Sequence, residues 1–107
     1  MKIPHQYPFE KLRVWQAARE IGKQVYLTTS TFPRSEIYGL TSQCNRAAVS
    51  VAVNLAEGSL MELSCLLVIS SDLGMLSADS EQQLRSSIEQ LSRQLNALHR
   101  SQRSRID

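Results

Sequence analysis

Residues that form tight turns and aromatic residues are both scarce in this sequence. Its 107 residues include only four glycines and three prolines, and aromatic residues make up 6% of the chain. A strand-rich fold needs many tight turns, so this composition favours helices. A chain of this length can also bury only one modest core. We therefore expect residues 1–107 to form a single all-α domain.

Long apolar segments are missing as well. The longest apolar run lies near Leu63 to Ile69, which is far short of the ~20 residues that cross a membrane. The first residues contain Pro4 and Pro8 and do not resemble a signal peptide. We therefore expect a soluble, cytoplasmic protein that has no membrane partner.

Residues that commonly carry out chemistry or bind metals are few and scattered. The two cysteines, Cys44 and Cys65, form no C-x-x-C pair, and His5 and His99 stand alone. Reduced thiols in the core are the interpretation that we favour, and a disulfide or a metal site is the alternative. The sequence also contains no glycine-rich phosphate-binding loop and no G-x-S-x-G motif. We therefore predict no enzymatic activity, no catalytic, cofactor-binding or metal-binding residues, and no small-molecule substrate.

Apolar residues recur at helical spacings of three and four along most of the chain. The pattern predicts a first helix over about 9–30, which Pro33 separates from the next. Gly74, followed by the acids and serines from Ser77 to Glu81, predicts that one helix stops and another starts. The last helix, predicted over about 79–101, has the clearest apolar seam, formed by Leu84, Ile88, Leu91, Leu95 and Leu98.

Several short motifs occur in an order that resembles a known family. They are Phe9-Glu10-Lys11-Leu12-x-x-Trp15, Phe32-Pro33, Tyr38-Gly39-Leu40-Thr41-Ser42-Gln43, Arg46-Ala47-Ala48-Val49-Ser50 and Asn54-Leu55-Ala56-Glu57-Gly58-Ser59. In these motifs the sequence is similar to the bacterial four-helix-bundle proteins encoded in 23S ribosomal RNA intervening sequences. That family includes the accessory protein of diversity-generating retroelements. The resemblance implies an antiparallel four-helix bundle that associates as a homopentamer and has no established cellular role.

The sequence departs from the family pattern at Gly58-Ser59. Here one Gly-Ser pair stands where the family has two, and the roughly 18 residues that would separate them, about five helical turns, are missing. Ala52 also stands where many members have a proline that would bend the helix. Since a glycine inside a helix costs only about 1 kcal/mol, Gly58 can either form a turn or lie within a helix. We favour one fused middle helix over about 36–73, which gives three helices rather than four.

A fused middle helix would leave apolar surface without a partner. Each half of it would pack against only one other helix, which exposes the stripes from Leu40 to Leu55 and from Leu63 to Leu73. We therefore predict a homo-oligomer, either the pentamer that the family resemblance implies or a domain-swapped assembly.

Two groups of polar residues are candidate functional positions. One group, which falls within an arc of about 80° opposite the leucine seam of the last helix, consists of Arg85, Arg93, Arg100 and Arg103. A solvated outer face explains this group without a ligand, and phosphate contact with RNA or DNA is the alternative. The other group, which matches polar positions of the family motif, consists of Arg46, Asn54 and Glu57. We expect it to form hydrogen bonds within or between the helices.

These observations favour a small, non-enzymatic helical module for assembly or interaction. The alternative function is a nucleic-acid-binding accessory factor that uses the basic helix face to bind structured RNA or DNA or to act beside a reverse transcriptase. A third interpretation is a shortened relative that folds without the family's activity.

Overall fold

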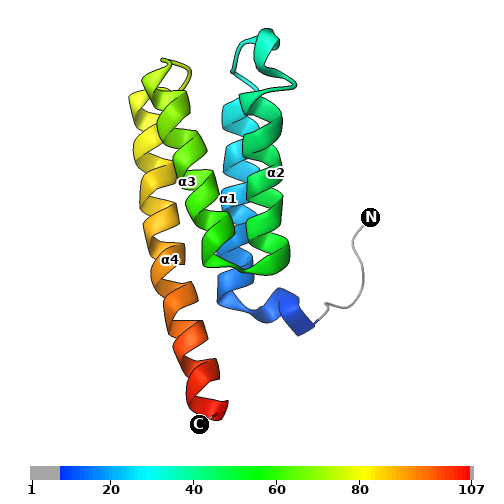
Figure 1. Ribbon diagram of the computed structural model, residues 1–107, viewed down its shortest axis with the longest axis vertical. Helices are drawn as coiled ribbons and strands as arrows, with labels where there is room; N and C mark the ends of the chain where they lie inside the picture. The colour runs from blue at the N-terminus through cyan, green and yellow to red at the C-terminus, as the bar shows by residue number, and fades with distance from the viewer. Residues whose placement is uncertain (1–7, 107) are drawn as a thin grey trace.

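The structure, a computed structural model, describes residues 8–106, without the side chains of residues 10, 11 and 103–106. Within that range the chain forms four α-helices and no strand, which confirms the all-α prediction. The helices are α1 (Arg13–Thr29), α2 (Leu40–Asn54), α3 (Glu57–Asp72) and α4 (Ala78–Ile106), and two short 3₁₀ helices, η1 (Pro8–Lys11) and η2 (Arg34–Glu36), precede α1 and α2. The four α-helices form an antiparallel, up-and-down bundle (Figure 1).

Each helix packs against two neighbours in a square arrangement. α1 contacts α2 and α4, and α3 contacts the same two helices, so that α1 and α3 lie on one diagonal and α2 and α4 on the other. Short connections place consecutive helices side by side and antiparallel. Phe32, in the connection between α1 and α2, is buried and joins the core.

The chain reverses direction between α2 and α3, so the predicted fused helix over 36–73 is wrong and the bundle has four helices instead of three. The turn consists of Leu55, in the left-handed conformation with φ 47° and ψ 45°, and the extended residue Ala56. A left-handed non-glycine residue costs about 1–2 kcal/mol. The reversal buries Leu60, Leu63 and Leu67, each of which contributes about 1.5–3 kcal/mol. Burial therefore outweighs the strain at the turn.

The connection between α3 and α4 has the predicted stop and start signals. Gly74 has a φ of 75°, and its N–H donates to the carbonyl of Ser71 at 2.9 Å. Such a left-handed glycine is the common end of a helix. Ser77 then caps α4, because its Oγ accepts the N–H of Ser80 at 3.1 Å. The helix boundary predicted at Gly74 is confirmed.

The core combines small side chains from α1 and α2 with larger ones from α3 and α4. The buried residues of α1 and α2 are mostly alanine and valine: Val14, Ala18, Ile21, Val25, Cys44, Ala47, Ala48 and Val51. Those of α3 and α4 are almost all leucine: Leu60, Leu63, Leu66, Leu67, Leu84, Ile88, Leu91 and Leu95. The apolar stripes that we expected a fused helix to expose therefore lie on core faces of α2 and α3, apart from Leu73, which is 60% exposed.

The two ends of the chain differ from the predicted helix ranges. α1 begins at Arg13, later than the predicted start near residue 9, because η1 precedes it. α4 has 29 residues against 17 in α1, or about 44 Å against about 26 Å, and it runs past the predicted end near residue 101. Its last turns extend beyond the rest of the bundle (Figure 1).

Candidate interaction surfaces

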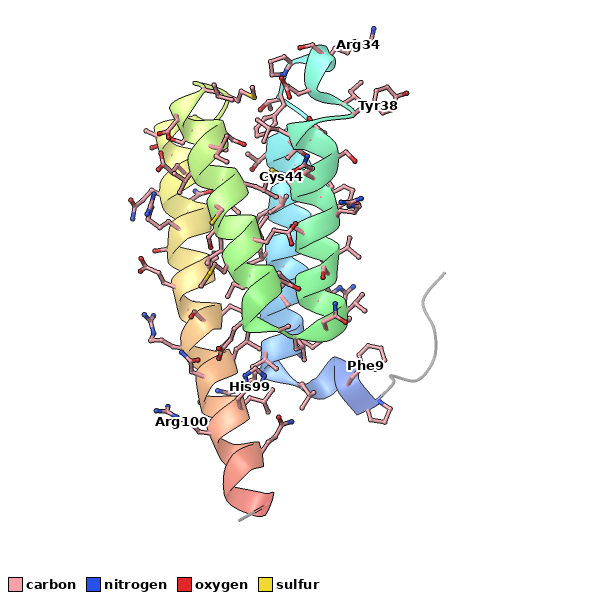
Figure 2. All side chains as sticks on the ribbon, in the orientation of Figure 1. Phe9, Arg34, Tyr38, Cys44, His99 and Arg100 are labelled. Carbon is pink, nitrogen blue, oxygen red and sulfur yellow. The ribbon has the colours of Figure 1, made fainter. Side chains whose placement is uncertain are left out.

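The predicted basic face lies on the outer side of α4. Arg85, Arg93 and Arg100 are exposed there, and Figure 2 shows Arg100 projecting away from the bundle. Arg103 belongs to the last turns of α4, and its side chain lies outside the described part of the structure. The structure therefore brings three of the four predicted arginines onto one described surface.

Arg85 differs from Arg93 and Arg100 because its guanidinium group forms an ion pair with Glu81. Its Nη2 donates to Oε1 of Glu81 at 2.9 Å, and Oε2 of Glu81 accepts a hydrogen bond from Ser71 Oγ at 2.7 Å. These bonds join the end of α3 to the start of α4 and lower the pKa of Glu81, with the Ser71 hydrogen bond as the largest cause and Arg85 next. Among the described side chains, Arg93 and Arg100 form no ion pair.

Two of the three family-motif residues lie on either side of the turn between α2 and α3. Asn54 Nδ2 donates to Ser50 Oγ at 3.0 Å, and Ser50 Oγ lies 2.9 Å from Ser59 Oγ, so a chain of hydrogen bonds joins α2 to α3. Glu57, the first residue of α3, has its Oε1 at 3.3 Å from Nδ1 of His99 on α4. In this arrangement both residues hold neighbouring helices together at one end of the bundle.

The third family-motif residue, Arg46, lies on the outer surface instead. It lines a shallow groove of about 560 Å³ between α1 and α2, together with the exposed apolar residues Tyr26, Val49 and Val53. Sequence reasoning missed this groove because it followed only the inner face of α2. The spacing of four between Val49 and Val53 is a signal that could have found it.

α3 also presents exposed apolar residues opposite its buried face. Met61 and Leu73 are 68% and 60% exposed, and Val68 and Ile69 are exposed as well. The sequence could have predicted these exposed apolar residues, because the apolar positions from Leu60 to Ile69 are not confined to one side of a helix.

The two cysteines lie in different environments. Cys44 is fully buried and points into the bundle (Figure 2), where burial raises the pKa of its thiol against the opposing effect of a long contact with Ser70. Cys65 is exposed on α3. The prediction of two core thiols is therefore right for Cys44 and wrong for Cys65.

The described residues contain neither a cluster of potential metal ligands nor a membrane-spanning helix. No group of three or more histidine, cysteine, aspartate or glutamate residues gathers there in a way that could hold a metal ion. Within residues 8–106, no helix combines the length and the apolar character needed to cross a membrane.

The first half of the bundle matches a known protein family. The 23S rRNA-intervening sequence protein family matches residues 10–60, which run from η1 through α2 to the fourth residue of α3. The four-helix bundle agrees with this match. Over these residues the chain is similar to the 23S rRNA-intervening sequence proteins. Comparison with curated proteins found no match.

The segment that matches the family includes one of the candidate surfaces and leaves out the other two. The groove between α1 and α2, with Arg46, lies inside the segment that matches the 23S rRNA-intervening sequence proteins. The basic face of α4 and nearly all of the exposed side of α3 lie beyond Leu60, outside that segment.

Proposed function

We propose that this protein is a non-catalytic helical module that works as a homo-oligomer in the cytoplasm. The supporting observation is the apolar outer surface. Each helix already buries an inner face, yet large apolar side chains of α1, α2 and α3 are 44–74% exposed, namely Tyr26, Leu27, Val49, Val53, Met61, Val68, Ile69 and Leu73. Apolar patches of this kind are typical of protein–protein contacts. The unpaired thiols of Cys44 and Cys65 agree with a reducing compartment.

The groove between α1 and α2 is the contact that we assign to the family's assembly, because it lies in the segment that matches the family. The family resemblance implies five subunits. The domain-swapped alternative depended on a fused middle helix, so we propose that the subunits associate as intact bundles. A head-to-tail ring would place the groove of one bundle against a different surface of the next.

Sedimentation equilibrium over a wide micromolar range tests this proposal. We expect a mass that is a multiple of the chain mass and a melting temperature that rises with protein concentration. Val53→Glu, a change at a residue 74% exposed, should weaken association without unfolding the bundle. Gln83→Glu adds the same charge at an exposed position of α4 and serves as the control. A monomer whose melting temperature is independent of concentration would contradict the proposal.

A nucleic-acid-binding accessory factor remains the second candidate function, supported by the guanidinium groups of Arg93 and Arg100, which are exposed and form no ion pair with the other described side chains. The family name points to 23S rRNA, and the contact would be with phosphates rather than bases. We expect a mobility shift with structured RNA and duplex DNA at low salt that weakens as salt rises.

The variants for this candidate remove two positive charges from the basic face of α4 or, as a control, one positive charge from another part of the surface. Arg93→Gln combined with Arg100→Gln should reduce the slope of log affinity against log salt by about two. Arg34→Gln, at the opposite end of the bundle (Figure 2), should change it much less. Absence of any shift at low salt would exclude this function.

A further inference from the structure

α3 has a second apolar seam on the side that faces away from the core. Gly58, Met61, Cys65, Val68 and Asp72 follow one another at spacings of three and four, as the positions of a helix–helix seam do. We call this set the outer seam. Met61, Cys65 and Val68 are exposed at its centre. Helices that are apolar all round are normally covered on all sides, so we expect another molecule to cover the outer seam.

A cavity opens beside the outer seam, between α3 and α4. Its volume is about 160 Å³, and its apolar walls include Leu67, Val68, Leu84 and Ile88. It is large enough to receive one apolar side chain. Met61 lies two turns before Val68 on α3 and is 68% exposed. Its long, flexible apolar side chain suits such an irregular space.

We propose that a second copy of this chain covers the outer seam, with the two α3 helices antiparallel about a two-fold axis at Cys65. Residues whose numbers add to 130 then oppose each other, so Met61 lies opposite the partner's Ile69 and next to the partner's Val68. Each Met61 therefore reaches the cavity of the other subunit. A two-fold contact requires such reciprocity, because the same patch supplies both knob and hole.

The charges at the two ends of the outer seam favour the antiparallel arrangement. It places Asp72 of each copy opposite the partner's Gly58, in the first turn of α3. Ala56, which precedes that turn, supplies no side-chain cap, and the acid of the turn, Glu57, is held by His99 on α4 at 3.3 Å. A carboxylate is stabilised beside the N–H groups of such a helix start. A Cβ added at Gly58 would meet nothing within 4 Å, so the backbone there is open to approach. A parallel pair would instead bring the two Asp72 carboxylates together.

This inference rests on the proposed self-assembly but concerns a different contact. All residues of the outer seam after Gly58 lie beyond Leu60, outside the segment that matches the family. The two-fold contact is thus additional to any ring formed through the groove between α1 and α2.

Cross-linking through the native thiols tests the position of the two-fold axis. A short bismaleimide forms one thioether with each of two cysteines, so it should link two full-length chains through Cys65. We expect a covalent dimer that Cys65→Ser abolishes and that Cys44→Ser, at the buried cysteine, leaves unchanged. This test uses the wild-type chain, so its result does not depend on whether a variant folds. Absence of a cross-linked dimer would count against the proposed contact.

Met61→Glu tests the knob and hole. It should weaken the two-fold association by at least about 30-fold, because each dimer would bury two unpaired carboxylates. Leu27→Glu, at a residue 72% exposed on α1, is the matched control and should leave cross-linking unchanged. Circular dichroism melting would show that both variants fold.

The outcomes separate this inference from the proposed function. An oligomer in sedimentation that gives no cross-link at Cys65 and is insensitive to Met61→Glu would overturn the α3 contact and leave self-assembly standing. A monomer at every concentration would overturn both. A Cys65-linked dimer lost in Met61→Glu would establish the contact.

Discussion

The two hairpins of the bundle build their shares of the core in different ways. The α1–α2 hairpin buries mainly alanine and valine, whereas the α3–α4 hairpin buries almost only leucine. Small side chains let two helices approach closely, and large ones fill the space between helices that lie further apart. The first hairpin should therefore be destabilised mainly by substitutions that add side-chain volume, and the second mainly by substitutions that remove it.

Truncating a leucine of the second hairpin should have the largest effect. Leu91 is fully buried on α4, so we expect Leu91→Ala to lower the free energy of unfolding by about 2–5 kcal/mol through lost burial and a residual cavity. Leu27→Ala, at a residue 72% exposed, should change it by less than about 0.5 kcal/mol. Urea unfolding at a single protein concentration measures both. Equal losses in the two variants would contradict the described core.

Enlarging a small residue of the first hairpin should come next. Ala48 is fully buried where α2 packs in the bundle, and Ala48→Leu should cost about 1–3 kcal/mol because the neighbouring helices must move apart. Ala97→Leu makes the same change at an exposed position of α4 and should be close to neutral. If Ala48→Leu were as stable as the wild type in urea, the close packing of the first hairpin would be refuted.

Replacing Gly74 and Gly22 with alanine should change the stability of the bundle in opposite directions. Gly74 has a φ of 75°, so Gly74→Ala should destabilise the α3–α4 connection by about 1–2 kcal/mol. Gly22 lies inside α1, where an added Cβ meets nothing within 4 Å, so Gly22→Ala should stabilise the bundle by about 0.5–1 kcal/mol. Thermal unfolding compares them directly. A loss of stability in Gly22→Ala would show that the outer side of α1 is covered in the assembly.

The sequence was sufficient where a local signal sets the structure. Gly74 and Ser77 are residue types that end and begin helices, and both act where predicted. The turn between α2 and α3 was missed because it depends on Leu55, a residue with no preference for the left-handed conformation that it adopts. What places it there is the burial of Leu60, Leu63 and Leu67 against other helices, and single-residue preferences do not report such tertiary packing.

The candidate surfaces were predictable to a similar extent. The helical period placed Arg85, Arg93 and Arg100 on one outer face, as the structure has them. The spacing of four also suits an ion pair between Glu81 and Arg85 on one helix. It could not show that Ser71 binds the same carboxylate, since that contact depends on the way α3 ends beside α4. The outer seam of α3 was overlooked for another reason: on an apolar helix, the period does not distinguish the buried side from the exposed one.

The smallest predicted effect concerns the contact that joins α3 to α4 through Glu81. Ser71 and Arg85 hold the pKa of Glu81 below its ordinary value near 4.5, so the stabilisation is complete above that value and is lost as pH falls through the lower pKa of the folded state. Glu81→Gln should thus melt at a lower temperature than the wild type near pH 6, and the gap should narrow as pH falls below 4.5. Glu89→Gln removes a carboxylate from the same helix without touching Ser71 and serves as the control. A gap that persisted unchanged at low pH would mean that Glu81 acts through packing rather than charge.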